Sequence, residues 1–212
     1  MPAVPIAIAG AQLAVPRHVC AFFNSADEEY RVLLPFIKEG FEWGDKAVHV
    51  LDPRRHTDHL GRLSAAGIDV SAAQVNAQLE IKSNAETYLR DGRFDPDRML
   101  EVFEAIAGGG AGQGFSRSRI VCHMDWAVDR GSHVEQLVEF ESRVNEVWRR
   151  HEDAVVCTYD LSKFGAETVI DILRTHPMVI ISGLLQQNPF FTPPDQFLPE
   201  LRERRARRRA VI

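Results

Sequence analysis

A strand–turn–helix–strand pattern over residues 17–52 constrains the fold more than any other feature of the sequence. It begins with the apolar run HVCAFF at residues 18–23, passes through a polar turn, and continues with Leu33, Ile37 and Phe41 at helical spacing. Ser25 begins a helix-capping box just before this helix, and the apolar run AVHVL follows it at residues 47–51. The segment therefore predicts a strand–helix–strand unit.

Further apolar runs alternate with amphipathic helices along the rest of the chain. The predicted strands cover residues 79–82, 120–124, 154–159 and 178–181, with a shorter outer strand after Gly183. The helices between them are marked by N-caps such as Asp95 and by apolar stripes such as Leu137, Phe140 and Val144. Continuous apolar strands that alternate with helices imply a mostly parallel sheet covered on both faces. The predicted fold class is α/β, a three-layer α/β/α domain.

Three segments are predicted to lie outside this regular alternation. Residues 1–16 are apolar and rich in small residues but carry no basic residue, so we expect a flexible arm and not a secretory signal. Residues 108–114 contain five glycines and follow a helix, the reverse of the order in a phosphate-binding loop, so we expect a flexible connector. Residues 193–212 form a Pro-rich segment and a basic helix, which leaves residues 17–192 as the domain.

Charge and cysteine content limit the class of protein. The net charge is −5, yet six arginines and one glutamate lie between Arg202 and Arg209. Such a tail can bind nucleic acid, an acidic partner or anionic lipid, but the acidic body repels phosphates, so we favour a solvated helix end or a junction with the rest of a longer protein. Cys20, Cys122 and Cys157 are odd in number and lie in apolar runs, which indicates free thiols in a reducing cytoplasm. No segment approaches the ~20 apolar residues of a membrane helix.

Two family resemblances rest on these segments. The order of elements resembles that of RecA/KaiC-type ATPases, with the strand before Asp125 in the place of their Walker B strand. The closer resemblance is to the MEDS domain, a sensory domain named for methanogens, methylotrophs and the regulator DcmR. The segments that resemble it are HVCAFF (18–23), LPFIKEG (34–40), TYLRDGRFDPD (87–97), CTYD (157–160), LRTHP (173–177) and NPFF (188–191). Together they span nearly the whole chain before the basic tail.

The MEDS resemblance implies a RecA-like fold without ATPase machinery, used as the input module of regulators and kinases. It also implies a small organic ligand as the signal. It carries no binding residues over to this chain. The chain departs from the family pattern at residues 122–126, where it has CHMDW and GEMSW is expected.

The residues that end the predicted strands define a candidate ligand site. In an open α/β sheet, ligands bind beyond the carboxyl ends of the strands, near the point where the winding direction reverses. The residues expected at this carboxyl edge are Phe23, Asn24, Ser25, Asp52, Asp125, Trp126, Tyr159 and Asp160. Their aromatic rings would form an apolar wall, and their amide and carboxylate groups would orient a small molecule. The alternative for each residue is structural, with aromatics that cap the core and aspartates that cap turns.

The same edge lacks what nucleotide chemistry requires. The first turn, at residues 24–27, contains neither Gly nor Lys, so it cannot form a phosphate loop of the usual kind. Asp125 could hold Mg²⁺ for phosphoryl transfer only against phosphates, which this turn does not bind. No G-x-S-x-G elbow is present either. We therefore predict a non-enzymatic protein that uses no cofactor.

Histidines and cysteines suggest a second kind of site. His18 and His176 are both expected at the amino edge of the sheet, where they would meet if their strands are neighbours and could bind a metal with Cys20 or Cys157. A histidine at a helix C-terminus and inert buried thiols explain the same residues, so we assign no metal site. The pair His56 and His59 is expected on a solvated helix surface.

These observations predict a cytoplasmic sensory domain that binds a small organic ligand and regulates a partner or an attached output domain, such as a transcription regulator or histidine kinase. Two alternatives stay open: a degenerate RecA/KaiC-type nucleotide-binding enzyme, and a protein-interaction module that uses the basic tail. Nucleic acid is expected only through the arginine tail, no membrane association is expected, and a homodimer stays open.

Overall fold

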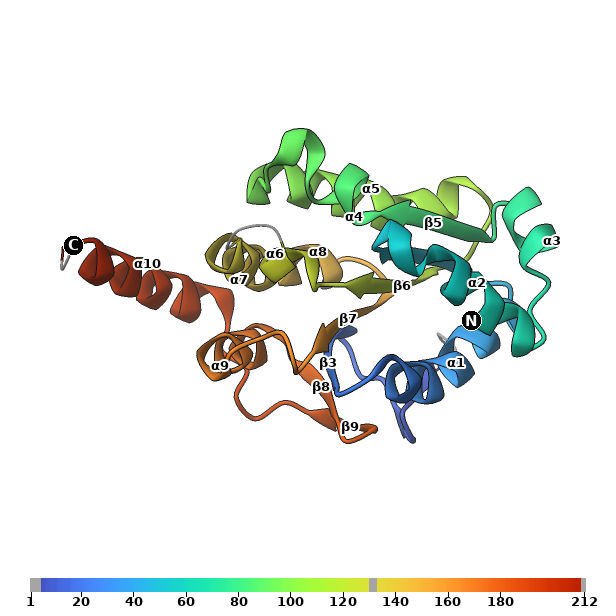
Figure 1. Cartoon of the computed structure of the whole chain (residues 1–212), viewed down its shortest axis with the longest axis horizontal. Coiled ribbons are helices and arrows are strands. Elements are labelled where there is room, and N and C mark those ends of the chain that lie inside the picture. Colours follow the sequence, from blue (N-terminus) through green and yellow to red (C-terminus); the bar gives the residue numbers. More distant parts are fainter. Residues whose placement is uncertain (1–4, 130–132, 211–212) are drawn as a thin grey trace.

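A seven-stranded sheet forms the centre of the molecule (Figure 1). The structure, a computed structural model, describes residues 5–129 and 133–210. The strand order is β5-β4-β6-β7-β3-β8-β9, and all neighbours are parallel except the antiparallel pair β8 and β9. The strands are β3 (His18–Phe23), β4 (Lys46–Leu51), β5 (Leu79–Ser83), β6 (Ser118–His123), β7 (Ala154–Asp160), β8 (Met178–Ile181) and β9 (Leu184–Gln187).

Helices cover both faces of this sheet. One face packs against α1 (Ala26–Glu42), α2 (His56–Ala65) and α3 (Val70–Val75). The other face packs against α5 (Pro96–Gly112), α7 (Val134–Arg143), α8 (Asn145–Trp148) and α9 (Ala166–Thr175). Short elements connect these layers: η1 (Pro53–Arg55), α4 (Asn84–Thr87), η2 (Arg90–Gly92) and α6 (Trp126–Asp129). The predicted three-layer α/β/α class and the mostly parallel sheet are confirmed.

Alternation along β3 shows how one strand serves both cores. Val19, Ala21 and Phe23 belong to the core beneath α1, whereas Cys20 and Phe22 belong to the core beneath α7. Successive side chains of a strand point to opposite faces, so a fully apolar strand must be covered twice. All six residues of β3 are buried, so both faces of this strand are covered.

The predicted flexible arm is wrong for the residues that the structure describes. Residues 5–16 include the hairpin strands β1 (Ala7–Ile8) and β2 (Ala11–Gln12). Ile6, Ile8 and Leu13 are buried against the core beneath α1. Burial of these three apolar side chains stabilises a segment whose sequence is too short to show strand periodicity. Residues 1–4 of the predicted arm lie outside the described residues.

The predicted flexible glycine connector is also wrong, because residues 108–112 continue helix α5. A Cβ atom at Gly110 would come within 2.8 Å of Ser118 Oγ. Glycine therefore allows the end of α5 to approach the start of β6 closely, and this packing compensates for the low helix propensity of the run.

The basic C-terminal helix α10 (Pro194–Ala210) begins against α7 and α9 and extends beyond them (Figure 1). Phe197 and Leu201 are buried with Val138 of α7. Arg204 pairs with an acid of α9, and Arg205 pairs with acids of α7. The body of the chain thus supplies acidic partners for part of the tail. No helix among the described residues is long and apolar enough to cross a membrane.

Candidate functional site

A cavity of about 200 Å³ lies at the carboxyl edge of the sheet, between the ends of β3 and β7. The chain leaves β3 for α1 on one face and leaves β7 for α9 on the other, so this is a point where the winding reverses. We call this space the rim cavity. Its lining residues are Phe23, Ser25, Ala26, Glu29, Arg55, Asp125, Thr158, Tyr159, Asp160 and Lys163.

Charged side chains of both signs line the rim cavity. Arg55 donates through Nη2 to Glu29 Oε2 at 2.9 Å and through Nη1 to His123 Nδ1. Lys163 Nζ lies 2.9 Å from Asp125 Oδ2. Burial raises the pKa of Glu29 although Arg55 opposes the shift, and burial together with Arg55 lowers the pKa of His123 to about 3. The cavity therefore combines acceptors and donors in a partly enclosed setting, which suits a small polar molecule.

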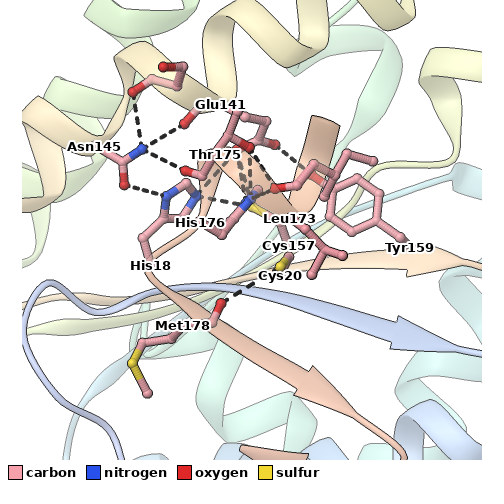
Figure 2. Close-up of polar contacts among 12 residues, drawn as sticks. His18, Cys20, Glu141, Asn145, Cys157, Tyr159, Leu173, Thr175, His176 and Met178 are labelled. Carbon is pink, nitrogen blue, oxygen red and sulfur yellow. Dashed lines mark hydrogen bonds and ion pairs between the residues drawn. The ribbon is translucent and has the colours of Figure 1, made fainter. Parts of the chain in front are cut away.

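A second polar group lies inside the molecule, between the sheet and α7, α8 and α9 (Figure 2). His18, Glu141, Cys157 and His176 are all buried, and one ligand atom from each lies within 4.8 Å of the others. Glu141 Oε2 lies 3.2 Å from His18 Nε2 and 3.3 Å from His176 Nε2. Cys157 Sγ lies 3.6 Å from His18 Nε2 and 3.8 Å from Glu141 Oε2. We call these four residues the convergent cluster.

The side chains around the convergent cluster hold it in place. Tyr159 donates its hydroxyl to Glu141 Oε1 at 3.0 Å. Asn145 Oδ1 lies 3.1 Å from His18 Nδ1, while its amide nitrogen donates to three backbone carbonyls. Burial alone would raise the pKa of Glu141, but His176 and His18 lower it well below the usual range. Burial and His176 lower the pKa of His18.

A third group forms a line of hydrogen bonds beneath α1 and α2. Tyr30 OH lies 2.7 Å from His59 Nδ1, and His59 Nε2 lies 2.8 Å from His49 Nδ1. We call these three residues the histidine line. The expectation that His59 is solvated is wrong, because His59 is buried and shares a helix face with Leu63. Burial lowers the pKa of His59 to about 3, and burial together with the neighbouring His59 lowers the pKa of His49 well below its ordinary value.

Comparison with known families identifies the domain. The sequence matches the family described as MEDS, the methanogen/methylotroph, DcmR sensory domain, over residues 17–177. The chain belongs to the MEDS family. This match covers most of the chain and includes every residue of the rim cavity and of the convergent cluster.

Two individual proteins are similar to this MEDS domain. The transcriptional repressor DcmR of Methylorubrum extorquens is 24% identical over 173 residues, which are 80% of this chain and 61% of the repressor. The chain thus spans about three-fifths of the length of that relative. A KaiC-like protein from Pyrococcus horikoshii superimposes with a TM-score of 0.55 and 14% identity, over 80% of this chain and 71% of the other. This second likeness shows the RecA-like fold alone.

The structure brings most of the predicted site residues of the MEDS domain together. Phe23, Ser25, Asp125, Tyr159 and Asp160 line the rim cavity. Asp52 and Trp126 line an adjacent cavity of about 330 Å³, which shares Asp125 with the rim cavity. Asn24 lines neither of these two cavities, because its side chain donates to Glu28 at the start of α1.

Several of these residues also have the alternative structural roles, in which aromatic side chains cap the core and aspartates cap turns. Trp126 is buried and stacks on Tyr88 with ring centroids 4.6 Å apart. Asp52 accepts from Arg54, which lowers the pKa of Asp52 to about 2, and Asp160 accepts from Ser162 in the turn after β7. Capping and cavity lining therefore coexist at this edge.

Sequence reasoning missed the residues that helices and the turn after β7 contribute to the two sites. Glu29, Arg55 and Lys163 line the rim cavity, and Glu141 is central to the convergent cluster. A signal was present for Glu141, since it lies four residues after Leu137 on the apolar face of α7. Glu29 lies four residues before Leu33 on the buried face of α1. A search for acidic residues within the apolar stripe of a predicted helix would have identified both glutamates.

The predicted meeting of His18 and His176 is confirmed. Strands β3 and β8 are parallel neighbours, and the two imidazole rings lie with their centroids 4.2 Å apart. His176 follows the last residue of α9, so the helix-terminus explanation for its position also holds.

Proposed function

We propose that this MEDS domain is a non-enzymatic sensor that binds a small organic molecule in the rim cavity. The observation that carries the proposal is the rim cavity itself, an opening of about 200 Å³ at the winding reversal of a sensory-family fold. Phe23 and Tyr159 supply aromatic surface, and Ser25 and Asp160 supply polar contacts. A volume of this size suits a small organic molecule.

Charge at the rim cavity argues against a triphosphate as the ligand. Glu29, Asp125 and Asp160 line the space, and the two cationic side chains there, Arg55 and Lys163, lie within 3 Å of Glu29 and Asp125, respectively. Carboxylates that face the cavity repel phosphate oxygens. The turn at residues 24–27 has neither the glycines nor the lysine that would offset this repulsion.

A signal follows if the ligand favours one conformation of the lining elements over another. Arg55 of η1 bridges Glu29 of α1 and His123 of β6, so a ligand that competes for Arg55 would loosen the contact between these elements. We propose that this change reaches a regulatory partner or an attached output domain. The similarity to a longer transcriptional repressor supports this part of the proposal.

A pair of tryptophan substitutions tests ligand binding. Ala26 is the exposed first residue of α1 and lines the rim cavity, so Ala26→Trp would fill the space. Ala166 is the exposed first residue of α9 and does not line the rim cavity, so Ala166→Trp is a matched control. The probes are short-chain alcohols, amines and carboxylic acids, and the measurement is the thermal unfolding midpoint.

At least one of these probe classes should stabilise the wild-type chain and the Ala166→Trp variant but not the Ala26→Trp variant. At a concentration about 100 times Kd, the expected rise in Tm is roughly 5–10 °C. No response from any probe, or an equal response in all three proteins, would contradict binding in the rim cavity. Tight, magnesium-dependent ATP binding in a calorimeter would instead favour the nucleotide-enzyme alternative.

A further inference from the structure

Four possible metal ligands of the convergent cluster point at one another inside the protein (Figure 2). Bonds of the usual length from Zn²⁺ to nitrogen, oxygen and sulfur place tetrahedral ligand atoms about 3.3–3.8 Å apart. Four of the distances among the ligand atoms of His18, Glu141, Cys157 and His176 lie between 3.2 and 3.8 Å. The cluster therefore already has nearly the spacing of a tetrahedral site.

Hydrogen bonds outside the cluster orient both imidazole rings toward its centre. His176 Nδ1 lies 2.9 Å from the carbonyl oxygen of Ile172, which can only accept, so Nδ1 carries the proton. Asn145 directs its amide nitrogen at three carbonyls and therefore presents its oxygen to His18 Nδ1. In the neutral form of each ring, the lone pair is then on Nε2. A metal-binding histidine commonly has its second nitrogen held in this way.

The centre of the cluster brings together the Nε2 atoms of two histidines, a carboxylate oxygen and a thiol. His176 Nε2 is buried and makes no hydrogen bond, although it lies 3.3 Å from Glu141 Oε2. Two imidazole lone pairs and a buried carboxylate that face one another are unfavourable unless a metal cation lies between them or a ring is protonated at Nε2. A single divalent ion would satisfy all four residues at once.

We propose that His18, Glu141, Cys157 and His176 bind one divalent zinc ion. The donor set of two imidazoles, one thiolate and one carboxylate suits Zn²⁺ better than Mg²⁺ or Ca²⁺, which prefer oxygen ligands. Four protein ligands fill the coordination sphere, which is typical of a structural site and not of a catalytic one. Metal binding replaces the Cys157 thiol proton, which leaves to solvent, by a sulfur–zinc bond.

Zinc in this position would contact residues of four elements and would be linked to the rim cavity through Tyr159. The ligands come from β3, α7, β7 and the junction of α9 with β8, so the ion would join four elements. Tyr159 donates to Glu141 and also lines the rim cavity. The zinc proposal does not depend on the identity of a ligand in that cavity, because its own ligands are all side chains of the chain.

Metal analysis of the whole chain tests the proposal. The protein, produced without a histidine tag and purified without chelators, should contain about one zinc per chain by elemental mass spectrometry. Protein produced in cobalt-supplemented medium should show a thiolate-to-cobalt charge-transfer band together with the intense visible bands of tetrahedral Co²⁺. An octahedral cobalt spectrum without a sulfur band would overturn the assignment of Cys157.

Matched cysteine variants locate the ion. Cys157→Ser should abolish the charge-transfer band, whereas Cys20→Ser should keep it, because Cys20 is a buried free thiol of the neighbouring strand outside the cluster. Loss of the band in both variants, or in neither, would overturn the ligand set. If Cys157→Ser does not fold, X-ray absorption of the zinc-containing wild type decides, since it must show one sulfur neighbour. A folded wild type that contains no metal, and takes none up on refolding with Zn²⁺, would refute the proposal.

Discussion

Buried histidines have different contacts on the two faces of the sheet. In the convergent cluster, two imidazoles meet a carboxylate and a thiol around one point. In the histidine line, Tyr30, His59 and His49 follow one another through single hydrogen bonds. Neutral groups can supply one proton to each bond of the line, although the buried His49 Nε2 at its end makes no hydrogen bond. Neutral rings cannot supply a proton to every contact at a point where several acceptors meet, so we propose a metal ion for the convergent cluster and not for the histidine line.

The largest expected difference between the convergent cluster and the histidine line is the effect of Zn²⁺ on the free energy of unfolding. Under the zinc proposal, Zn²⁺ at about 1,000 times Kd should raise the free energy of unfolding of the metal-free chain by about 4 kcal/mol. Glu141→Gln should lose most of this response, since it removes an anionic ligand. His59→Asn should keep it, because His59 belongs to the histidine line. Chemical denaturation with and without Zn²⁺ measures the effect, and an equal response of the two variants would break the comparison.

Two tyrosine hydroxyls give the next largest contrast. Tyr159→Phe removes a hydrogen bond to the charged Glu141 and should lower the free energy of unfolding by about 1.5–3 kcal/mol. Tyr30→Phe removes a bond to a neutral ring and should lower it by about 0.5–1.5 kcal/mol. Urea denaturation at neutral pH compares the two substitutions. A larger loss in Tyr30→Phe would show that Glu141 is not charged.

Acid should act on the buried histidines whose pKa values lie far below the ordinary value, His59 and His123. His59 has its pKa lowered to about 3, against an ordinary value of 6.5. Between these values the unfolded chain binds a proton at this residue that the folded chain does not bind. Stability therefore falls as the pH falls below 6.5, by about 1.4 kcal/mol per pH unit for one such histidine.

Denaturation series between pH 6.5 and pH 5 measure this slope. His59→Gln should flatten the slope by about one proton relative to the wild type. The same slope in both proteins would mean that His59 is protonated in the folded state. His123, whose pKa is also about 3, should continue to contribute in the variant.

Removal of an ion pair of the C-terminal helix should have the smallest effect on the free energy of unfolding. Arg208 pairs with Glu167 of α9, and both side chains are more than half exposed. Arg208→Ala should change the free energy of unfolding by less than about 1 kcal/mol, and less still at high salt. Denaturation at low and high ionic strength tests this. A loss as large as that of Tyr159→Phe would show that surface pairs, and not the buried clusters, dominate stability.

Local periodicity was sufficient to predict much of the fold. The six-residue apolar run that became β3 could be covered only on both faces, and the same argument applies to β6 and β7. The carboxyl ends of these strands then had to share one edge, which is why Asp125 and Asp160 were expected there and now line one cavity. Alternation fixes the face to which a side chain points, and it does so within a few residues.

Contacts between distant segments could not be predicted in that way. Nothing near His18 in the sequence shows that β3 lies between β7 and β8, yet this order brings His176 and Cys157 to the ring. Glu141 and His59 have the periodicity of buried residues, but only packing shows which partners justify their burial. The isoleucines of the N-terminal segment are buried against the core beneath α1, which is formed by segments distant in the sequence.

By itself, the sequence determined the layers of this protein and the edge of the sheet at which polar residues gather, because both follow from short-range periods in the chain. The tertiary structure decided which polar residues meet, because strand order and helix packing join residues more than a hundred positions apart, as His18 and Glu141 are. A carboxylate on an apolar helix face is costly until such partners are in place.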